Sequence, residues 1–341
     1  MLQKIILVVL LITAMALPAM AQEMPPLPGE QIIGDLGAPR GLAFDADGNL
    51  LIAEAGVGGE TESVMAGPEG ESTVRSGLSG RIISVAPDGT ATDLIPGFPS
   101  YAFETETLGL YRVIPQGESL WVLYSGGGPA NTGAFWSDSV VEYDVATLAV
   151  KNVIQMNGYE LANDPDGNGY DTNVADIAWG EDGTLYIVNA GQNALLSWTE
   201  EAGLATVQVW PENSVPDSIE IAENGDIYIG FLGEGLAPGA AKIEHWSNGE
   251  LVETFSGLNA VTDILLDGDT LYAVQLVIFG EQGPGPGSVV TVSSEGVTPV
   301  AEGLLAPFAI AKGPDGALYV TYGTIAFGPG MTGGVVKLAG M

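Results

Sequence analysis

A short pattern of apolar and polar residues recurs along the chain. The stretch "PRGLAFDADGNLLIAEAG" at residues 39–56 has an apolar segment, an Asp-Gly pair and a second apolar segment. Near-copies follow at 174–191 and 307–323. Two such segments joined by an Asp-Gly or Asn-Gly pair are typical of a β-hairpin. The pattern therefore predicts one hairpin repeated several times.

The turn of this hairpin occurs in six copies. The turns fall at Asp47-Gly48, Gln116-Gly117, Asp182-Gly183, Asn224-Gly225, Asp267-Gly268 and Asp315-Gly316. In the second half of the chain they recur about every 40 residues, the length of a propeller blade with four short strands. A further hairpin follows the first, as in 80–95 and 241–255. We therefore expect an all-β fold, a six-bladed β-propeller with four-stranded blades and almost no helix.

The last copy is one strand short of a complete blade, because it ends at the apolar segment 333–338. Residues 31–35 match the outer strand that precedes the innermost strand in other copies. We expect this N-terminal strand to complete the blade begun by residues 304–338. Such closure of the ring leaves no open sheet edge.

The N-terminus carries the pattern of a secretory signal. Lys4 precedes an apolar run, and Ala19-Met20-Ala21 offers a small-residue cleavage site. The run is shorter than the ~20 residues of a membrane-spanning helix, which favours a signal peptide over an anchor. We expect an extracytoplasmic protein, periplasmic or secreted, with no membrane span after cleavage. The predicted organisation is a signal peptide at 1–21, a Pro-rich leader at 22–30 and a single propeller domain at 31–341.

Composition excludes several kinds of partner and chemistry. The chain has 9 Lys and Arg against 43 Asp and Glu, a net charge of −34. Nucleic acids and anionic lipid surfaces bind clustered basic residues, so neither is an expected partner. The absence of cysteine excludes disulfides and thiol chemistry. Because His245 is the single histidine, motifs that bind a metal through two histidines are excluded as well.

The extra length of the long copies falls mainly between the second and third strands of each blade. These insertions are rich in Gly and Pro, and they span residues 55–80, 125–138, 232–240, 279–287 and 323–334. In a propeller they share one face, and insertions on one face usually mark the binding face. We expect a monomer that binds a small-molecule or extracellular ligand there. The alternative is a surface that tolerates insertions.

The starts of the innermost strands line a propeller axis, and we expect them at Arg40-Gly41, Leu108-Gly109, Ala175-Asp176, Asp217-Ser218, Thr262-Asp263 and Phe308-Ala309. Asp176, Asp217 and Asp263 would come from three neighbouring blades. Converging carboxylates repel unless a cation or a proton lies between them, and Ca²⁺ takes six to eight oxygens of this kind. The alternatives are that each Asp caps the start of its own strand or acts as a general acid or base.

A second ring of residues closes the second strands, at Glu54, Tyr124, Asn189, Phe231, Gln275 and Tyr322. We expect Glu54 and Asn189 to add oxygen ligands to an axial calcium ion. The aromatic residues of the ring would wall a pocket together with Arg40, Gln275 and Phe308.

A loop before the third blade offers another candidate calcium site. Asp164, Asp166 and Asn168 alternate along the chain and Gly169 follows, as in the first half of an EF-hand loop. Ala175 stands where the second half of that loop requires a bidentate Glu, so a plain Asx-rich turn is the alternative. Asp171 and Asn173 follow directly and are candidate ligands of either calcium site.

The order of these motifs resembles one known family. The opening hairpin, a long Gly-rich loop, "SGRIISVAPDG" and the Asp-rich "NDPDGNGYDTN" before "VADIAWGEDGTLYIVNAGQNALL" look like the ScyD/ScyE-type family, exported proteins associated with scytonemin gene clusters. The resemblance covers the whole mature chain and implies a six-bladed, NHL-like, extracytoplasmic propeller. More distantly, calcium-dependent lactonases and strictosidine-synthase-like proteins share this architecture and hold an axial metal.

Two functions follow as expectations. The first is an exported binding or accessory protein with calcium as a structural or axial ion. The alternative is a calcium-dependent hydrolase of lactones or esters, in which the metal would polarise the carbonyl and activate water. A purely scaffolding surface protein is a third possibility, and it needs neither an axial ion nor a pocket.

Overall fold

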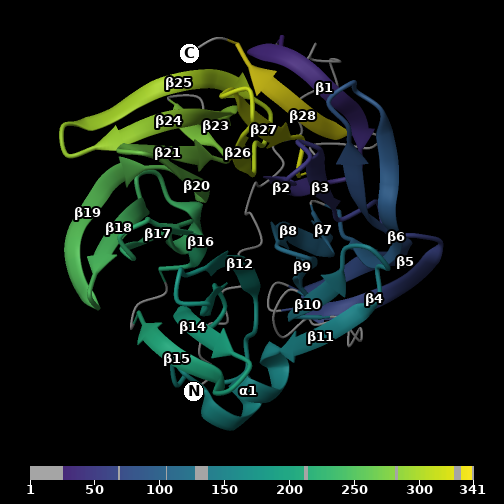
Figure 1. The fold of residues 1–341 in the computed structure, drawn as a ribbon, viewed down its shortest axis with the longest axis horizontal. Coiled ribbons are helices and arrows are strands. Elements are labelled where there is room, and N and C mark those ends of the chain that lie inside the picture. The colour runs from purple at the N-terminus through teal and green to yellow at the C-terminus, as the bar shows by residue number, and fades with distance from the viewer. Residues whose placement is uncertain are drawn as a thin grey trace.

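The structure is a computed structural model that describes residues 26–67, 70–104, 106–126, 137–210, 214–280, 283–325 and 332–339. The predicted signal peptide at 1–21 and the start of the leader lie outside the described residues. Within the described ranges, six antiparallel sheets surround one axis (Figure 1). This arrangement confirms the six-bladed β-propeller that the repeated hairpins predict.

In each blade the strands follow one another from the axis outward. Blade 1 contains β2 (Pro39–Phe44), β3 (Leu50–Glu54), β5 (Gly70–Val85) and β6 (Ala91–Ala102), with β4 (Thr61–Gly67) and β7 (Thr107–Leu108) attached. Blade 2 contains β8 (Leu110–Gln116), β9 (Ser119–Tyr124), β10 (Ser139–Asp144) and β11 (Val150–Gln155). Blade 3 contains β12 (Val174–Trp179), β13 (Leu185–Asn189), β14 (Ala194–Thr199) and β15 (Gly203–Val209).

The other three blades follow the same plan. Blade 4 contains β16 (Pro216–Ile221), β17 (Ile227–Phe231), β18 (Ala241–Ser247) and β19 (Glu250–Leu258). Blade 5 contains β20 (Val261–Asp267), β21 (Thr270–Gln275), β24 (Gly287–Ser293) and β25 (Gly296–Leu304). Blade 6 contains β26 (Ile310–Lys312), β27 (Leu318–Tyr322), β28 (Gly333–Leu338) and β1 (Gly29–Leu36).

The N-terminal strand closes the ring, as the sequence predicts. Strand β1 pairs antiparallel with β28, with Gln31 opposite Val336 and Ile33 opposite Val335. It begins at Gly29, within the predicted leader. The first strand of the domain therefore forms the outer edge of its last blade, and the two ends of the domain are hydrogen-bonded to each other.

Apolar patterning decides how each strand is placed. The second strands β3 and β9 are buried along their whole length, because neighbouring blades cover both of their faces. The outer strand β19 is mostly exposed. Six apolar clusters fill the spaces between adjacent blades; one of them joins Leu36 and Ile52 of the N-terminal region to Phe308 and Val335 of blade 6. The core is therefore a ring of interfaces between sheets.

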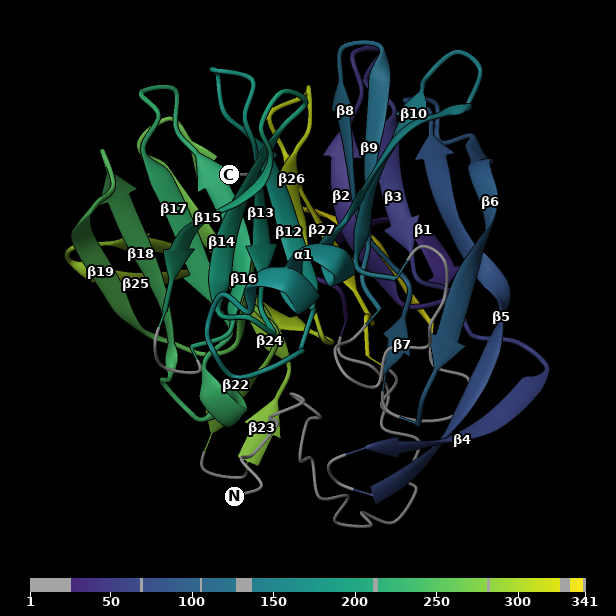
Figure 2. The same cartoon turned by 90° about the horizontal axis from the view of Figure 1, so that it is seen from below.

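The two faces of the propeller differ. On the turn face lie the tight turns that join first and second strands, where Gly48 and Gly183 adopt φ values of 80° and 81° that glycine tolerates best. The opposite face, called the long-loop face, carries β4 and the small hairpin of β22 (Ile278–Gly280) and β23 (Gly283–Gly285) (Figure 2). Within the described ranges, these insertions gather on one face as predicted.

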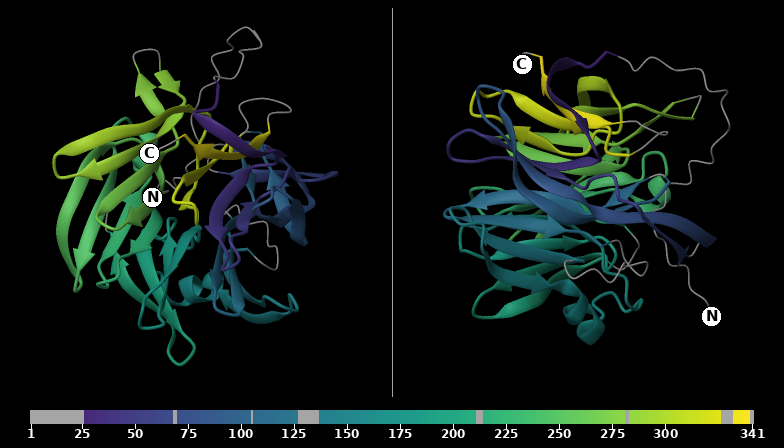
Figure 3. Two further views of the ribbon diagram at one scale, coloured as in Figure 1. Left: turned by 45° about the horizontal axis from the view of Figure 1, so that its top comes forward. Right: turned by 90° about the vertical axis from the view of Figure 1, so that its right-hand side faces the viewer.

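Two features lie outside the expected pattern. An eight-residue helix, α1 (Met156–Asn163), connects blades 2 and 3, and a short 3-10 helix, η2 (Glu234–Leu236), follows β17. Blade 1 is enlarged because β5 extends past the blade and pairs with β4 (Figure 3). Among the described residues, no helix has the length and apolar character needed to cross a membrane.

Candidate functional site at the propeller axis

In blades 1 to 5 the innermost strand is irregular where it starts. The ladder with the second strand shifts register between Leu110 and Arg112 in blade 2, between Val174 and Asp176 in blade 3, and at the equivalent point in blades 1, 4 and 5. Bulges of this kind redirect side chains and are common beside functional sites. Here they mark the level at which blades 2, 3 and 5 present charged side chains to the axis.

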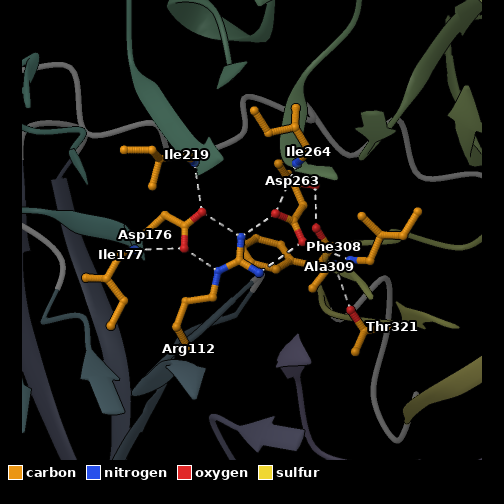
Figure 4. Close-up of polar contacts among 11 residues, drawn as sticks. Arg112, Asp176, Ile177, Ile219, Asp263, Ile264, Phe308, Ala309 and Thr321 are labelled. Carbon is orange, nitrogen blue, oxygen red and sulfur yellow. Dashed lines mark hydrogen bonds and ion pairs between the residues drawn. The ribbon is translucent and has the colours of Figure 1, made fainter. Parts of the chain in front are cut away.

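An arginine occupies the centre of this level (Figure 4). Arg112 donates hydrogen bonds to both carboxylate oxygens of Asp263, at 2.9 and 2.5 Å, and to Oδ2 of Asp176 at 3.0 Å. Its Nε lies 2.7 Å from Oδ1 of Asp176. All three side chains are at most 7 % exposed. One guanidinium from blade 2 thus bridges carboxylates from blades 3 and 5.

The sequence places the start of the blade 2 strand at Leu108-Gly109, and the structure corrects this to Tyr111-Arg112. The error arises because the turn between the first and second strands is shorter in blades 2 and 5 than in the other blades. The axial residue of these two blades therefore lies fewer residues before the turn glycine. The signal was present, since counting back five residues from Gly268 gives Asp263 and the same count from Gly117 gives Arg112.

The two aspartates also hold the backbone of neighbouring blades together. Asp176 accepts the N–H of Ile177 at 2.8 Å and that of Ile219 in blade 4 at 2.9 Å. Asp263 repeats the arrangement with Ile264 at 3.0 Å and Ile310 in blade 6 at 2.8 Å. The alternative interpretation, in which these aspartates cap strand starts, is therefore confirmed for both, and each one caps the next blade as well.

Charge is unevenly balanced in this cluster. Burial lowers the pKa of Arg112, but Asp176 and Asp263 together raise it by more than burial lowers it. The guanidinium therefore stays charged. Burial raises the pKa of Asp176, Arg112 lowers it, and repulsion from Asp263 raises it again. With two carboxylates against one cation, the cluster keeps an excess of negative charge.

A cavity of about 240 Å³ extends from this cluster toward the turn face. Its floor is Arg112 with the two aspartates, and it reaches Gln116 at the first turn of blade 2. The wall is mainly aliphatic and includes Leu42, Ile114, Ile177, Ile219, Ile221, Ile264 and Ile310. This is the axial cavity.

Two further polar groups line the axial cavity. Glu220 accepts no hydrogen bond from a described residue; burial, followed by repulsion from Asp263 and Asp176, raises the pKa of its carboxyl to about 8. The indole N–H of Trp179 is buried and has no acceptor among the described residues. The cavity thus combines an aliphatic wall with a charged floor and two further polar side chains, Glu220 and Trp179, that have no hydrogen-bond partner among the described residues.

On the other side of Arg112, the residues one position earlier face the long-loop side. The Arg40 guanidinium lies over the rings of Phe308 and Tyr111, at 4.6 and 5.1 Å from their centroids, and donates to the carbonyl of Thr107 at 3.1 Å. Asp217, from the blade opposite Arg40, is 5 % exposed, and burial raises its pKa to about 8. Asp176 and Asp263 occupy the axial position of their strands, whereas Asp217 precedes the axial position of its own strand by one residue.

In the expected second ring, the polar residues contact their own blades and the aromatic residues lie between blades. Glu54 accepts the N–H of Gly37 at 2.6 Å and pairs with Arg81. Asn189 accepts the N–H of Asn173 at 3.1 Å. Gln275 accepts that of Asn259 at 2.7 Å and donates to Ser288 at 3.0 Å. Tyr124, Phe231 and Tyr322 lie in the apolar clusters between blades.

The axial residues do not fit a calcium ion as they are arranged. Asp176 and Asp263 already surround a guanidinium, which a cation would have to displace, and Glu54 and Asn189 are bonded elsewhere. In the described part of the chain, no three acidic or histidine side chains are arranged to hold a metal ion. Metal-dependent hydrolysis at the axis therefore gains no support from the geometry.

The Asp-rich loop forms a chain of local turns. Asp166 accepts the N–H of Asn168 at 3.0 Å, which is the geometry of an Asx turn, and Asp164 accepts the N–H of Gly169, five residues on, at 3.1 Å. Asn173 accepts a hydrogen bond from Ser125 at 3.0 Å. Asp171 lies apart from these turns, against Glu160 of α1.

Comparison with known proteins identifies the fold. No protein-family model matches the chain, and no curated protein matches it in sequence. Among solved structures, a protein of Thermus thermophilus described as an oxidoreductase (glucose dehydrogenase) matches at a TM-score of 0.56 and 17 % identity, covering 92 % of this chain and 100 % of its own.

Two further solved structures have the same likeness. Streptogramin B lyase matches at a TM-score of 0.51 and 11 % identity, covering 92 % of this chain and 97 % of its own. A glucose dehydrogenase matches at a TM-score of 0.52 and 14 % identity, covering 93 % of this chain and 100 % of its own. The chain has the six-bladed propeller fold. At these identities the likeness concerns the fold and leaves activity open.

Proposed function

We propose that this chain is an exported binding protein whose axial cavity takes a small organic cation, an apolar molecule that carries a protonated amine. One observation carries the proposal: the axial cavity has an aliphatic wall and an unpaired carboxyl, Glu220, beside a floor with two carboxylates and one guanidinium. The sequence placed the ligand on the long-loop face, whereas this cavity lies on the turn side of Arg112.

The wall selects for an apolar ligand of limited size. Ile177, Ile219 and Ile264 are 2–4 % exposed and hold the cavity shape through the inter-blade clusters. Sites for drug-sized ligands usually measure ~300–1,000 Å³, so about 240 Å³ suits a smaller molecule. A ring of six carbons with one substituent is of suitable size.

The polar side selects for positive charge. A carboxylate in an apolar cavity is costly unless a cation pairs with it, and a protonated amine supplies that cation. An anionic ligand would meet Glu220, Asp176 and Asp263 with only Arg112 in favour, and the guanidinium already donates to both aspartates. We therefore expect discrimination by charge as well as by shape.

Calorimetric titration with three molecules of one skeleton tests this proposal: cyclohexylamine, cyclohexanol and cyclohexanecarboxylate. We expect the amine to bind, the alcohol to bind at least tenfold more weakly and the carboxylate not to bind. Glu220→Gln keeps the shape of the side chain and should weaken amine binding at least tenfold. The matched control is Glu181→Gln, a change at an exposed turn of blade 3, which should leave binding unchanged.

Equal affinity for amine and alcohol, or unaltered amine binding by Glu220→Gln, would overturn the proposed ligand class. Export is tested separately, by N-terminal sequencing of the protein from a fractionated culture. A mature chain that starts near Gln22 in the periplasm or medium supports it, and an uncleaved intracellular chain contradicts it.

A further inference from the structure

A second group of buried polar side chains lies where blade 2 passes into blade 3, away from the axial cavity. It includes Glu160 of α1, Asp171 of the following loop and Gln192 of the turn after β13. Glu160 is 2 % exposed; its Oε1 accepts the N–H of Asp171, and its Oε2 is buried with no hydrogen-bond partner among the described residues. One oxygen of this carboxylate thus positions the loop, and no described residue donates to the other in hydrogen-bond geometry.

Gln192 is buried beside Glu160, close enough for its amide to lower the pKa of that carboxyl. Its side chain is 1 % exposed, and neither its amide oxygen nor its amide nitrogen lies in hydrogen-bond geometry with a described residue. Leaving a buried polar atom without a partner is costly, and such atoms are rare in folded proteins. Two of them next to an unpaired carboxylate oxygen point to a ligand at this place.

The charges around these atoms define that ligand. Burial raises the pKa of Glu160 to about 8 and that of Asp171 to about 7, and repulsion between neighbouring carboxyls adds to both shifts. Asp138, whose Oδ1 accepts the N–H of Gly126 at 3.1 Å, contributes further negative charge next to Glu160. No basic side chain is among the groups that shift the pKa of Glu160 or Asp171.

We propose that this junction is a calcium site whose protein ligands are Glu160 Oε2, the Asp171 carboxylate and the Gln192 amide oxygen. Ca²⁺ accepts carboxylate, amide, backbone and water oxygens together in flexible geometry, so it does not need three acidic ligands. This agrees with the absence of a three-carboxylate cluster in the described part of the chain. The smaller Mg²⁺ demands octahedral geometry and keeps most of its water, so it fits a mixed, buried set less well.

The ion would connect elements that come from two blades. Helix α1 follows β11 of blade 2, Asp171 precedes β12 of blade 3, and Gln192 follows β13. Calcium would thus fasten α1 and its loop to blade 3. The sequence singles out Asp171 for calcium; Glu160 and Gln192 lack a motif and are brought to it by the helix and the turn.

Thermal unfolding of the purified mature chain tests the proposal, in EDTA, in millimolar CaCl₂ and in millimolar MgCl₂. At a hundredfold excess over Kd, we expect Ca²⁺ to raise Tm by about 4 °C, and Mg²⁺ to raise it far less. Calorimetric titration with CaCl₂ should give one site per chain.

Glu160→Gln separates a ligand role from a structural one. It removes a buried charge and keeps the bond to the loop, so its Tm in EDTA should equal or exceed that of the wild type, while the rise with Ca²⁺ disappears. Asp164→Asn is the matched control, because Asp164 is exposed in the neighbouring Asp-rich loop and an Asn oxygen can accept the same bond. It should keep the full rise.

The proposal is overturned if Ca²⁺ gives no larger rise than Mg²⁺ in the wild type, or if Glu160→Gln keeps the rise. Loss of the rise in Asp164→Asn alone would assign calcium to the Asp-rich loop instead. Should Glu160→Gln fail to fold, Gln192→Leu provides a second variant with the same expected loss. None of these outcomes bears on amine binding, which involves Glu220 in another cavity.

Discussion

Removing the axial arginine is the most direct test of how the blades are joined at the centre. In Arg112→Met, the apolar side chain fills much of the same space, but Asp176 and Asp263 lose the guanidinium that bridges them. Both carboxylates are at most 5 % exposed and cannot turn to solvent without leaving the backbone N–H groups of Ile219 and Ile310. The variant therefore keeps two buried negative charges that repel each other.

The expected loss is large for a single substitution. Removing one partner of a buried ion pair costs about 3–5 kcal/mol, because the other partner stays buried without compensation. For a domain of this size a loss of about 4 kcal/mol lowers Tm by about 6 °C. Arg112→Lys should lose less, since it keeps the charge but replaces a three-nitrogen fork with one ammonium.

The free energy of unfolding, from urea denaturation at pH 7.5 and pH 5, checks this prediction. Arg112 lowers the pKa of Asp176, so its loss raises that pKa in the folded state further above the value in the unfolded chain, and the variant gains stability on protonation. The deficit against the wild type should therefore shrink at pH 5. As a control, Lys312→Met breaks a half-exposed pair with Asp267 and should cost below about 1 kcal/mol at either pH. A deficit for Arg112→Met below about 1 kcal/mol, or one that stays constant with pH, would refute the reasoning.

Two more predictions concern stability. The pKa of Asp217, about 8 when folded, lies above its usual range, so the stabilisation from its bound proton is complete below about pH 4 and is lost as pH rises through 8. Asp217→Asn, which stays neutral, should therefore exceed the wild type in urea midpoint at pH 8.5 and not at pH 5; equal differences at both would contradict this. Leu36→Ala, at 2 % exposure in the interface that closes the ring, should cost about 2–5 kcal/mol by thermal or urea unfolding. A cost below about 1 kcal/mol would show that closure does not depend on this contact.

Much of the fold follows from local sequence. The apolar segments on either side of Asp182-Gly183 and Asp315-Gly316 predict hairpins because strand burial and turn geometry are both encoded within about ten residues. Six such hairpins and an incomplete last blade are enough to predict the pairing of β1 with β28. The alternative role of Asp176 and Asp263 as strand caps could likewise be predicted from the sequence, because it depends on short-range backbone contacts.

The site was harder to predict from the sequence, because its contacts join residues far apart in the chain. Arg112 meets Asp263 across 151 residues, and a bulge and a shortened turn decide which residue of blade 2 faces the axis. Glu160 and Gln192 belong to no motif and meet only because α1 folds back onto the turn after β13. By itself the sequence determined a closed ring of six hairpin-based blades, since hydrophobic period and turn residues act locally. Only the tertiary structure decided that an arginine compensates the axial aspartates, because that depends on the register of strands from three blades at once.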